Sequence, residues 1–379
     1  MRSDLLAIID TQRLVQNFRA LKACSTAGVK LCAPLKANAY GHGIDLVAPA
    51  LYDAGADEAA VATIVEALEL RRLGWDRPIL VLGNILSVAD ESERRERLAA
   101  VIRQRLTLTI TDETTVGLLL AAEPTAPIDV HLKIDTGMGR MGVAPERALE
   151  LIQAIRSVKA LRLTGIYSHF ATADLHELDL AGHQLATFRR TLTALSDFLP
   201  RGVTRHLANS AATISMPEAH FDMVRPGLAL YGYLPAEHMA ERIALRPILR
   251  LETHLTAVKE LPSGHCVGYG QTFTTRRPTR LGIAPIGYFD GFLRALSNAA
   301  IVSTDHGDAP IVGRISMDQL AVDLTDLPPV VPGTAITLIS DDPARPNSVA
   351  AIARRLGTIP YEVTCLLGQR IDRVAKAAS

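Results

Sequence analysis

The chain has 379 residues, with 40 basic and 40 acidic side chains and 48% hydrophobic residues. Balanced charge without runs of one sign argues against a nucleic-acid partner or a membrane-surface role, and no segment approaches the roughly 20 apolar residues of a membrane span. The length is comfortable for two domains with substantial cores.

The N-terminal segment and the cysteines predict a cytoplasmic protein. The opening residues, MRSDLLAIIDTQRL, contain acidic side chains early and lack the apolar stretch of a signal peptide. The cysteines at positions 24, 32, 266 and 365 are scattered and form no C-x-x-C pair. We therefore expect free thiols in a reducing compartment, and no metal site.

Strand-like and helix-like stretches alternate over the first two thirds of the chain. Runs rich in Val, Ile and Leu lie near residues 30–36, 58–62, 78–83, 106–110, 128–134, 162–168, 204–208 and 222–226. Helical periodicity separates most of them, as in 44–56, 64–74 and 144–157, and a short helix is expected after Ser210. This order predicts an α/β fold, a (β/α)8 TIM barrel over residues 11–240. The alternative, an open doubly wound sheet, lacks its G-x-G-x-x-G fingerprint.

Residues 241–379 predict a mainly β domain. Alternating patterns at 249–261, 299–307 and 334–340 are broken by turns rich in Gly, Pro and Asp, and a helix is expected near 347–357. The opening strand, within residues 1–10, precedes the barrel and is a candidate to join this second domain.

Lys36 stands at the end of the first barrel strand, in APLKANAYGHG. Barrel enzymes carry their reactive groups at the C-terminal ends of the strands. A lysine before a turn is usually an ordinary exposed residue. Held in a cavity, its amine can bond covalently to an aldehyde cofactor.

Lys133 lies inside an apolar strand, where an unpaired charge is costly. Asp135 shares its face and is the expected partner, and the glycine-rich loop that follows contains Arg140. A structural ion pair followed by a turn explains these residues as well as a functional site does.

The later barrel strands also end in polar residues. His169 ends the sixth strand, and phosphate sites of barrels often lie after strands seven and eight, on backbone N–H groups. At those two strand ends stand Asn209 with Ser210, and Arg225 with Gly227 and Leu228. An N-cap and a Pro-Gly turn are the plainer interpretation of the same residues.

Together these motifs resemble the bacterial alanine racemase family. The family's order is followed by APLKANAYGHG, HLKIDTGMGRMG, SHFATAD, HLANSAA and VRPGLALYG, and then by VGYGQTF, IAPIGYFDGF, IVGRISMDQLAVD and TIPYEVTCLLGQRIDR, as far as residue 373. The resemblance implies a homodimer that uses pyridoxal 5'-phosphate (PLP) to interconvert L- and D-alanine.

The resemblance also implies individual roles. Lys36 would bind PLP and serve as one acid–base group, and Tyr269 of the partner subunit would serve the opposite face of the substrate. The other implied positions are Tyr40, Ser210, Gly227, Leu228 and Tyr361 around the phosphate, Arg225 at the pyridine nitrogen, His169 and Asn209 beside the cofactor, Arg140 and the Met317 backbone at the substrate carboxylate, Tyr288 at the entrance, and Lys133 as a lysine that is carbamylated in many members.

The chain departs from the family pattern at three places, and three alternative functions share some of its motifs. The chain has Phe289 where alanine is common, Ile-Asp at 371–372 where Val-Pro is usual, and Ala375 in place of a frequent tyrosine. A broad-specificity racemase fits the same motifs, and neither the preferred amino acid nor a biosynthetic or catabolic role is fixed by them. A non-catalytic PLP-binding barrel would not need the second domain. A decarboxylase would favour an acidic residue at the position of Arg225.

Overall fold

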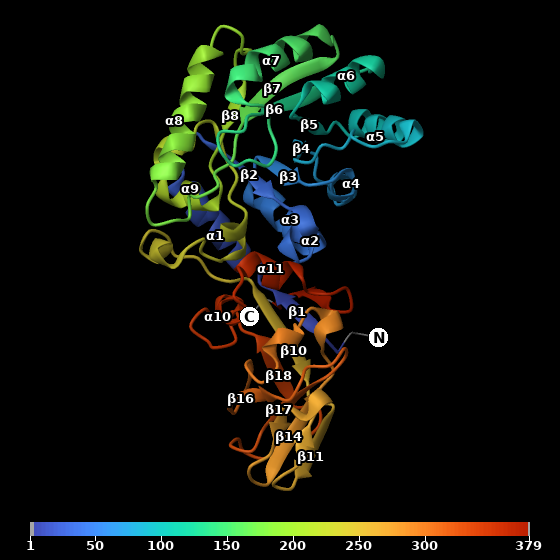
Figure 1. The fold of residues 1–379 in the computed structure, drawn as a ribbon, viewed down its shortest axis with the longest axis vertical. Helices are drawn as coiled ribbons and strands as arrows, with labels where there is room; N and C mark the ends of the chain where they lie inside the picture. The colour runs from blue at the N-terminus through green and yellow to red at the C-terminus, as the bar shows by residue number, and fades with distance from the viewer. Residues whose placement is uncertain (1–3, 378–379) are drawn as a thin grey trace.

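Eight parallel strands close into a barrel that forms one end of the elongated molecule (Figure 1). The computed structural model describes residues 4–377. The strands are β2 (Lys30–Pro34), β3 (Glu58–Val61), β4 (Ile79–Val81), β5 (Thr107–Ile110), β6 (Ile128–Lys133), β7 (Leu161–Tyr167), β8 (Thr204–His206) and β9 (Met223–Val224). Strands β3, β4 and β5 are buried at every position, which explains their continuous apolar runs. The predicted barrel is confirmed.

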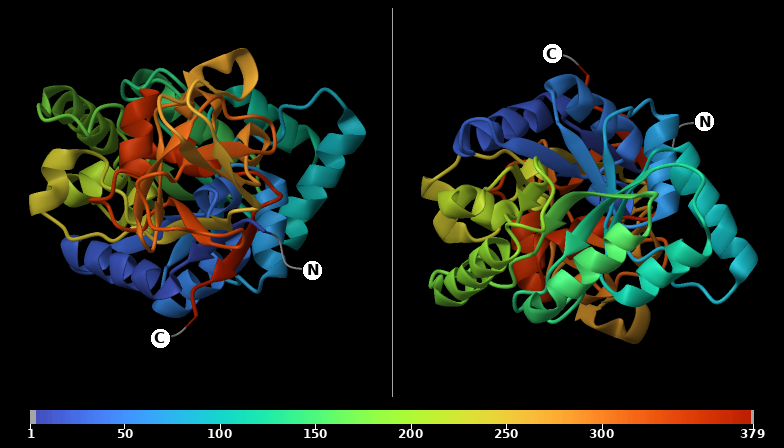
Figure 2. Two further views of the ribbon diagram at one scale, coloured as in Figure 1. Left: turned by 90° about the horizontal axis from the view of Figure 1, so that it is seen from below. Right: turned by 90° about the horizontal axis from the view of Figure 1, so that it is seen from above.

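Helices surround the strands, as the views along the long axis show (Figure 2). They are α1 (Thr11–Cys24), α3 (Ile44–Ala54), α4 (Ile64–Arg72), α5 (Glu91–Arg103), α6 (Glu113–Ala121), α7 (Ala148–Ser157), α8 (Asp179–Ala194) and α9 (Ser210–Ser215). Side chains of Asp10, Asp90, Asp112 and Asn209 cap four of them by accepting backbone N–H bonds. The helix after Ser210 is as short as expected.

The rest of the chain builds a nine-stranded sheet in the order β11-β14-β17-β16-β15-β18-β10-β1-β19. Its strands are β1 (Leu6–Ile9), β10 (Leu249–His254), β11 (Ala257–Leu261), β14 (Thr279–Ala284), β15 (Ile301–Thr304), β16 (Gly307–Val312), β17 (Leu320–Asp323), β18 (Ala335–Ile339) and β19 (Asp372–Ala375), and a separate hairpin joins β12 (Cys266–Val267) to β13 (Phe273–Thr274). The opening strand β1 lies between β10 and β19. The unusual residues 371–372 and 375 therefore leave the pairing of β19 intact.

Two helices lie between the barrel and the sheet (Figure 1). The helix expected near 347–357 is α10 (Val349–Leu356), and α11 (Pro360–Cys365), which the sequence patterns did not predict, packs on the loop after β2. Buried Asn17 of α1 fixes the same junction: its amide donates to the carbonyl oxygens of Leu230 and Arg246 and accepts from the Arg246 N–H. No helix of residues 4–377 is long and apolar enough to cross a membrane.

Candidate active site

Lys36 opens a short turn of unusual backbone, α2 (Lys36–Tyr40), directly after β2. The φ angles of residues 37–40 lie between 53° and 55°, in the left-handed region that costs an L residue roughly 1–2 kcal/mol. Such a turn persists only where neighbouring structure holds it. Burial lowers the pKa of the Lys36 amine, the charge of Arg140 lowers it further, and Glu66 acts in the opposite direction. More of this amine is therefore neutral and nucleophilic than in an exposed lysine.

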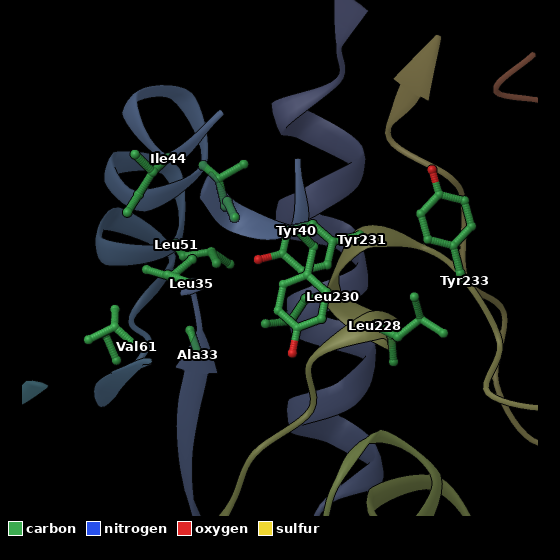
Figure 3. Close-up of a cluster of buried hydrophobic side chains, with 14 of the residues drawn as sticks. Ala33, Leu35, Tyr40, Ile44, Leu51, Val61, Leu228, Leu230, Tyr231 and Tyr233 are labelled. Atoms are coloured by element: carbon green, nitrogen blue, oxygen red, sulfur yellow. The ribbon is translucent and has the colours of Figure 1, made fainter. Parts of the chain in front are cut away.

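The turn ends at Tyr40, a buried tyrosine. Its ring centroid lies 5.1 Å from that of Tyr231 and 5.8 Å from that of Tyr361, and Figure 3 shows Tyr40 and Tyr231 side by side. A Cβ atom on Gly227 would lie only 2.6 Å from the Tyr40 hydroxyl oxygen, so glycine is needed for this close approach. Burial raises the pKa of Tyr40, and raises that of Tyr361 to about 12, which keeps both hydroxyls protonated.

The ends of β8 and β9 present backbone donors beside Tyr40. The Ser210 hydroxyl accepts the N–H of Ala229 at 3.2 Å and so joins the two strand ends. Within residues 4–377, the backbone N–H groups of Ser210, Gly227 and Leu228 have no acceptor. The side-chain oxygen of Asn209 accepts the Ala212 N–H at 3.0 Å, so Asn209 acts as the N-cap of α9.

Buried Arg225 is the centre of a polar network in the barrel. Its Nη1 lies 2.6 Å from His206 Nδ1, and its Nη2 donates to the Ser168 carbonyl oxygen at 2.8 Å and approaches His169 Nδ1 at 3.3 Å. His206 Nε2 lies 2.9 Å from His131 Nδ1. In the described part of the chain no residue accepts the Nε–H of Arg225.

Arginine only donates, and this fixes where the histidine protons lie. His206 Nδ1 must accept from Arg225, so His206 carries its proton on Nε2 and donates it to His131. His169 likewise accepts through Nδ1 and keeps an N–H on Nε2. Burial lowers the pKa of His131 to about 3 and those of His206 and His169 well below 6.5, helped by the charge of Arg225. The network is therefore one cation surrounded by neutral rings.

Lys133 is buried in the same barrel, with its Nζ 5.6 Å from the centroid of the Tyr167 ring. The expected ion pair with Asp135 is absent from residues 4–377. The Asp135 carboxylate instead accepts the backbone N–H groups of residues 137, 138 and 139, because the glycine-rich turn folds around it. Burial lowers the Lys133 pKa to about 8, and the charges of Arg140 and Arg225 contribute. Arg140, at the end of this turn, is exposed.

The other predicted residues lie on the β domain. Tyr269, Tyr288 and Met317 are 73%, 40% and 50% exposed. Tyr269 borders a cavity of about 480 Å³ lined by residues of β11, β14 and β17, and these strands lie at the end of the molecule away from the barrel (Figure 1). Within one chain, Tyr269 is thus separated from the barrel residues around Lys36.

Phe289, one of the departures named in the sequence analysis, is also exposed on the β domain. The guanidinium carbon of Arg370 lies 4.4 Å from the centroid of its ring. Arg370 also pairs with buried Asp290 and with Asp318. The backbone N–H of Phe289 donates to the Met317 carbonyl oxygen at 3.2 Å, so this phenyl ring stands beside the segment that carries Met317.

Two family models match the chain in succession. Residues 9–235 match the alanine racemase N-terminal domain, and residues 248–375 match the alanine racemase C-terminal domain. The chain belongs to the alanine racemase family. The alanine racemase of Halothermothrix orenii is 36% identical, over 98% of this chain and 96% of its own length. That of Prochlorococcus marinus is 40% identical, over 94% and 92%. The crystal structure of alanine racemase from D-cycloserine-producing Streptomyces lavendulae superposes with a TM-score of 0.91 at 32% identity, covering 100% of this chain and 98% of that one.

The fold of this alanine racemase family member brings three further polar residues to the site. His131 and His206 continue the network of Arg225, and the Glu66 carboxylate accepts the backbone N–H of Ala37 at 2.7 Å. Sequence reasoning missed all three. Glu66 had a visible signal, because Thr63 and Glu66 form a T-x-x-E capping box at the start of α4. His131 stands in an apolar strand, where a polar residue needs a partner.

Proposed function

We propose that this protein is a PLP-dependent racemase that interconverts L- and D-alanine, with Lys36 as the residue that binds the cofactor. The observation that carries the proposal is the meeting, in one barrel, of a half-buried lysine of lowered pKa and a buried arginine whose Nε–H has no acceptor among residues 4–377. The alanine racemases that the chain resembles along almost its whole length support the reaction and the substrate.

The residues present fit PLP. In the described part of the chain, the N–H groups of Ser210, Gly227 and Leu228 lack acceptors, and the Tyr40 hydroxyl reaches the same segment, so a phosphate group would find several donors there. The Nε–H of Arg225, which no residue between 4 and 377 accepts, suits a pyridine nitrogen that accepts a hydrogen bond. When bound, PLP delocalises the electron pair left on the α-carbon after its proton is removed.

An arginine at the pyridine nitrogen would limit the side reactions of such an enzyme. Arg225 is always protonated and only donates, so it cannot accept a hydrogen bond from a protonated ring nitrogen. The neutral histidines around it supply no proton either, because burial holds their pKa values low. Arg225 would therefore favour an unprotonated ring nitrogen in a bound PLP, which would disfavour transamination.

Racemisation needs a proton acceptor and donor on each face of the α-carbon. We propose Lys36 Nζ for one face and the hydroxyl of Tyr269 for the other. The N–H that His169 keeps on Nε2 would stabilise a tyrosinate of Tyr269 by donating to it. Arg140 and the Met317 backbone would hold the substrate carboxylate, and Tyr288 and Tyr361 would narrow the entrance.

We further propose a homodimer in which each active site takes Tyr269, Tyr288 and Met317 from the partner subunit. All three side chains are exposed, and Tyr269 borders a cavity lined by strands at the end of the β domain away from the barrel of its own chain. An isologous dimer would bring each set to the other barrel. The four cysteines are unpaired among residues 4–377, which supports our proposal of a cytoplasmic location. There the enzyme would supply D-alanine for peptidoglycan synthesis or would take part in the breakdown of alanine.

The test is a racemisation assay with a panel of L-amino acids. We expect alanine to be converted fastest, and the Lys36→Ala variant to convert none. Comparable rates for several larger amino acids would support the alternative of a broad-specificity racemase. A purified yellow protein that racemises nothing would favour a non-catalytic PLP carrier.

A further inference from the structure

We propose that Glu66 is a positioning residue that holds the left-handed turn carrying Lys36 and Tyr40. The Glu66 Oε1 atom accepts the backbone N–H of Ala37, the residue after the catalytic lysine, at 2.7 Å. Its Oε2 atom accepts the N–H groups of Ala62 at 2.8 Å and Thr63 at 3.0 Å. One carboxylate therefore ties the loop after β2 to the loop after β3.

The turn needs such a tie because its backbone is strained. Residues 37–40 include no glycine, yet all have positive φ angles. The exit of the turn is held by Asn38, whose side-chain oxygen accepts the N–H of Ile44 at the start of α3. The entrance is held by the bond from Ala37 to Glu66. Loss of that bond leaves the segment next to Lys36 free to relax toward ordinary backbone.

The simpler role of Glu66 is to complete the capping box of α4. Thr63 Oγ1 accepts the Glu66 N–H at 3.2 Å, and the Glu66 carboxylate accepts the Thr63 N–H. Capping of α4 accounts for the bond between Glu66 and Thr63. It does not account for the bond to Ala37, because Ala37 lies in the loop after β2 and is no part of the β3–α4 unit. The two roles can therefore be separated by substitution.

Glu66 also acts on Lys36 electrostatically. Burial and the charge of Arg140 lower the pKa of Lys36, whereas Glu66 raises it. The carboxylate thus fixes the position of the turn and moderates how easily the amine loses its proton. This role toward catalysis rests on the proposed function of Lys36, whereas the tie between the loops does not.

The experiment compares the full-length PLP-loaded protein with its Glu66→Ala and Thr63→Ala variants by amide hydrogen exchange. Thr63→Ala removes the side-chain cap of α4 and leaves the carboxylate in place. We expect Glu66→Ala to accelerate exchange in peptides spanning residues 37–41 about tenfold or more, and Thr63→Ala to change it less than about twofold. Equal exchange of this segment in the two variants, or no acceleration in Glu66→Ala, would overturn the proposal.

Glu66→Gln provides a milder variant that keeps the volume of the side chain. It removes the negative charge that raises the Lys36 pKa, so the limb of the kcat profile that reports deprotonation of Lys36 should move to lower pH. A limb at the unchanged pH would contradict the electrostatic role. The exchange measurement does not depend on turnover, so a protein that failed to racemise alanine would disprove the proposed function and leave this comparison valid.

Discussion

Lys133 should react with carbon dioxide to form a carbamate. Its pKa is lowered from 10.5 to about 8 by burial and by the positive charges of Arg140 and Arg225. At pH 7.5 such an amine is about one quarter neutral, whereas a lysine with a pKa of 10.5 is about 0.1% neutral. The nucleophilic form is therefore more abundant by a factor on the order of 200. The amine bonds to the carbon of carbon dioxide, releases one proton and becomes an anion that can pair with Arg140.

The unmodified lysine should lower the stability of the protein near neutral pH. The shift from 10.5 to about 8 corresponds to about 3 kcal/mol against the protonated form in the folded protein. The folded state binds this proton less well than the unfolded chain does, so the penalty is complete below pH 8 and disappears as the pH rises from 8 to 10.5. Carbamylation removes the penalty by replacing the cation with an anion.

The assay is 13C NMR of the protein in labelled bicarbonate, together with urea unfolding at pH 7 with and without bicarbonate. We expect a protein-bound carbamate signal that is missing in Lys133→Gln, and a higher free energy of unfolding in bicarbonate for the native chain only. Absence of the signal, its persistence in Lys133→Gln, or equal stabilisation of the variant by bicarbonate would refute the reasoning.

Three further substitutions probe the site. Arg225→Glu places an acceptor at the ring nitrogen, so racemisation should fall and pyruvate formation from alanine should become measurable; an unchanged product ratio would argue against the role of Arg225. Gly227→Ala sets a methyl group 2.6 Å from the Tyr40 hydroxyl and should weaken PLP binding, measured by titration, about tenfold or more. The control is Gly117→Ala, which has free space around its Cβ atom and should leave PLP binding unchanged. Ala37→Gly should raise the free energy of unfolding by up to about 1 kcal/mol, because the left-handed strain that glycine relieves is larger than the entropy cost of ordering a glycine. A lower free energy of unfolding in urea would contradict the claim that the backbone at residue 37 is strained.

The barrel and the place of its reactive residues could be predicted because two simple regularities hold. Buried parallel strands produce continuous apolar runs, and the C-terminal ends of such strands open on one face. Lys36, Lys133 and Arg225 each follow or end such a run, and the structure places all three in the same barrel. The short last strand, β9, could also be predicted from the sequence, because the apolar residues around Val224 are followed by a Pro-Gly turn.

Tertiary contacts decided what the sequence patterns did not reveal. No local pattern predicts a left-handed turn at 37–40. In the structure, the side chains of Glu66 and Asn38 accept backbone N–H groups at its two ends. Similarly, the spacing of Lys133 and Asp135 suggested an ion pair, yet the backbone N–H groups of the following turn take the carboxylate. The neutral state of His131 and His206 follows from burial beside Arg225, which only the fold brings about.

The most direct test of the central claim is whether two inactive chains restore one active site. Lys36→Ala and Tyr269→Ala proteins should each be nearly inactive. Unfolded and refolded together, about half of the dimers should be mixed, and each mixed dimer should contain one site with both native residues, so up to about one quarter of all sites should regain alanine racemisation. If no activity returns although mixed dimers are shown to form, Lys36 and the partner's Tyr269 do not act on the same substrate molecule, and the two-base account built on a shared site is wrong.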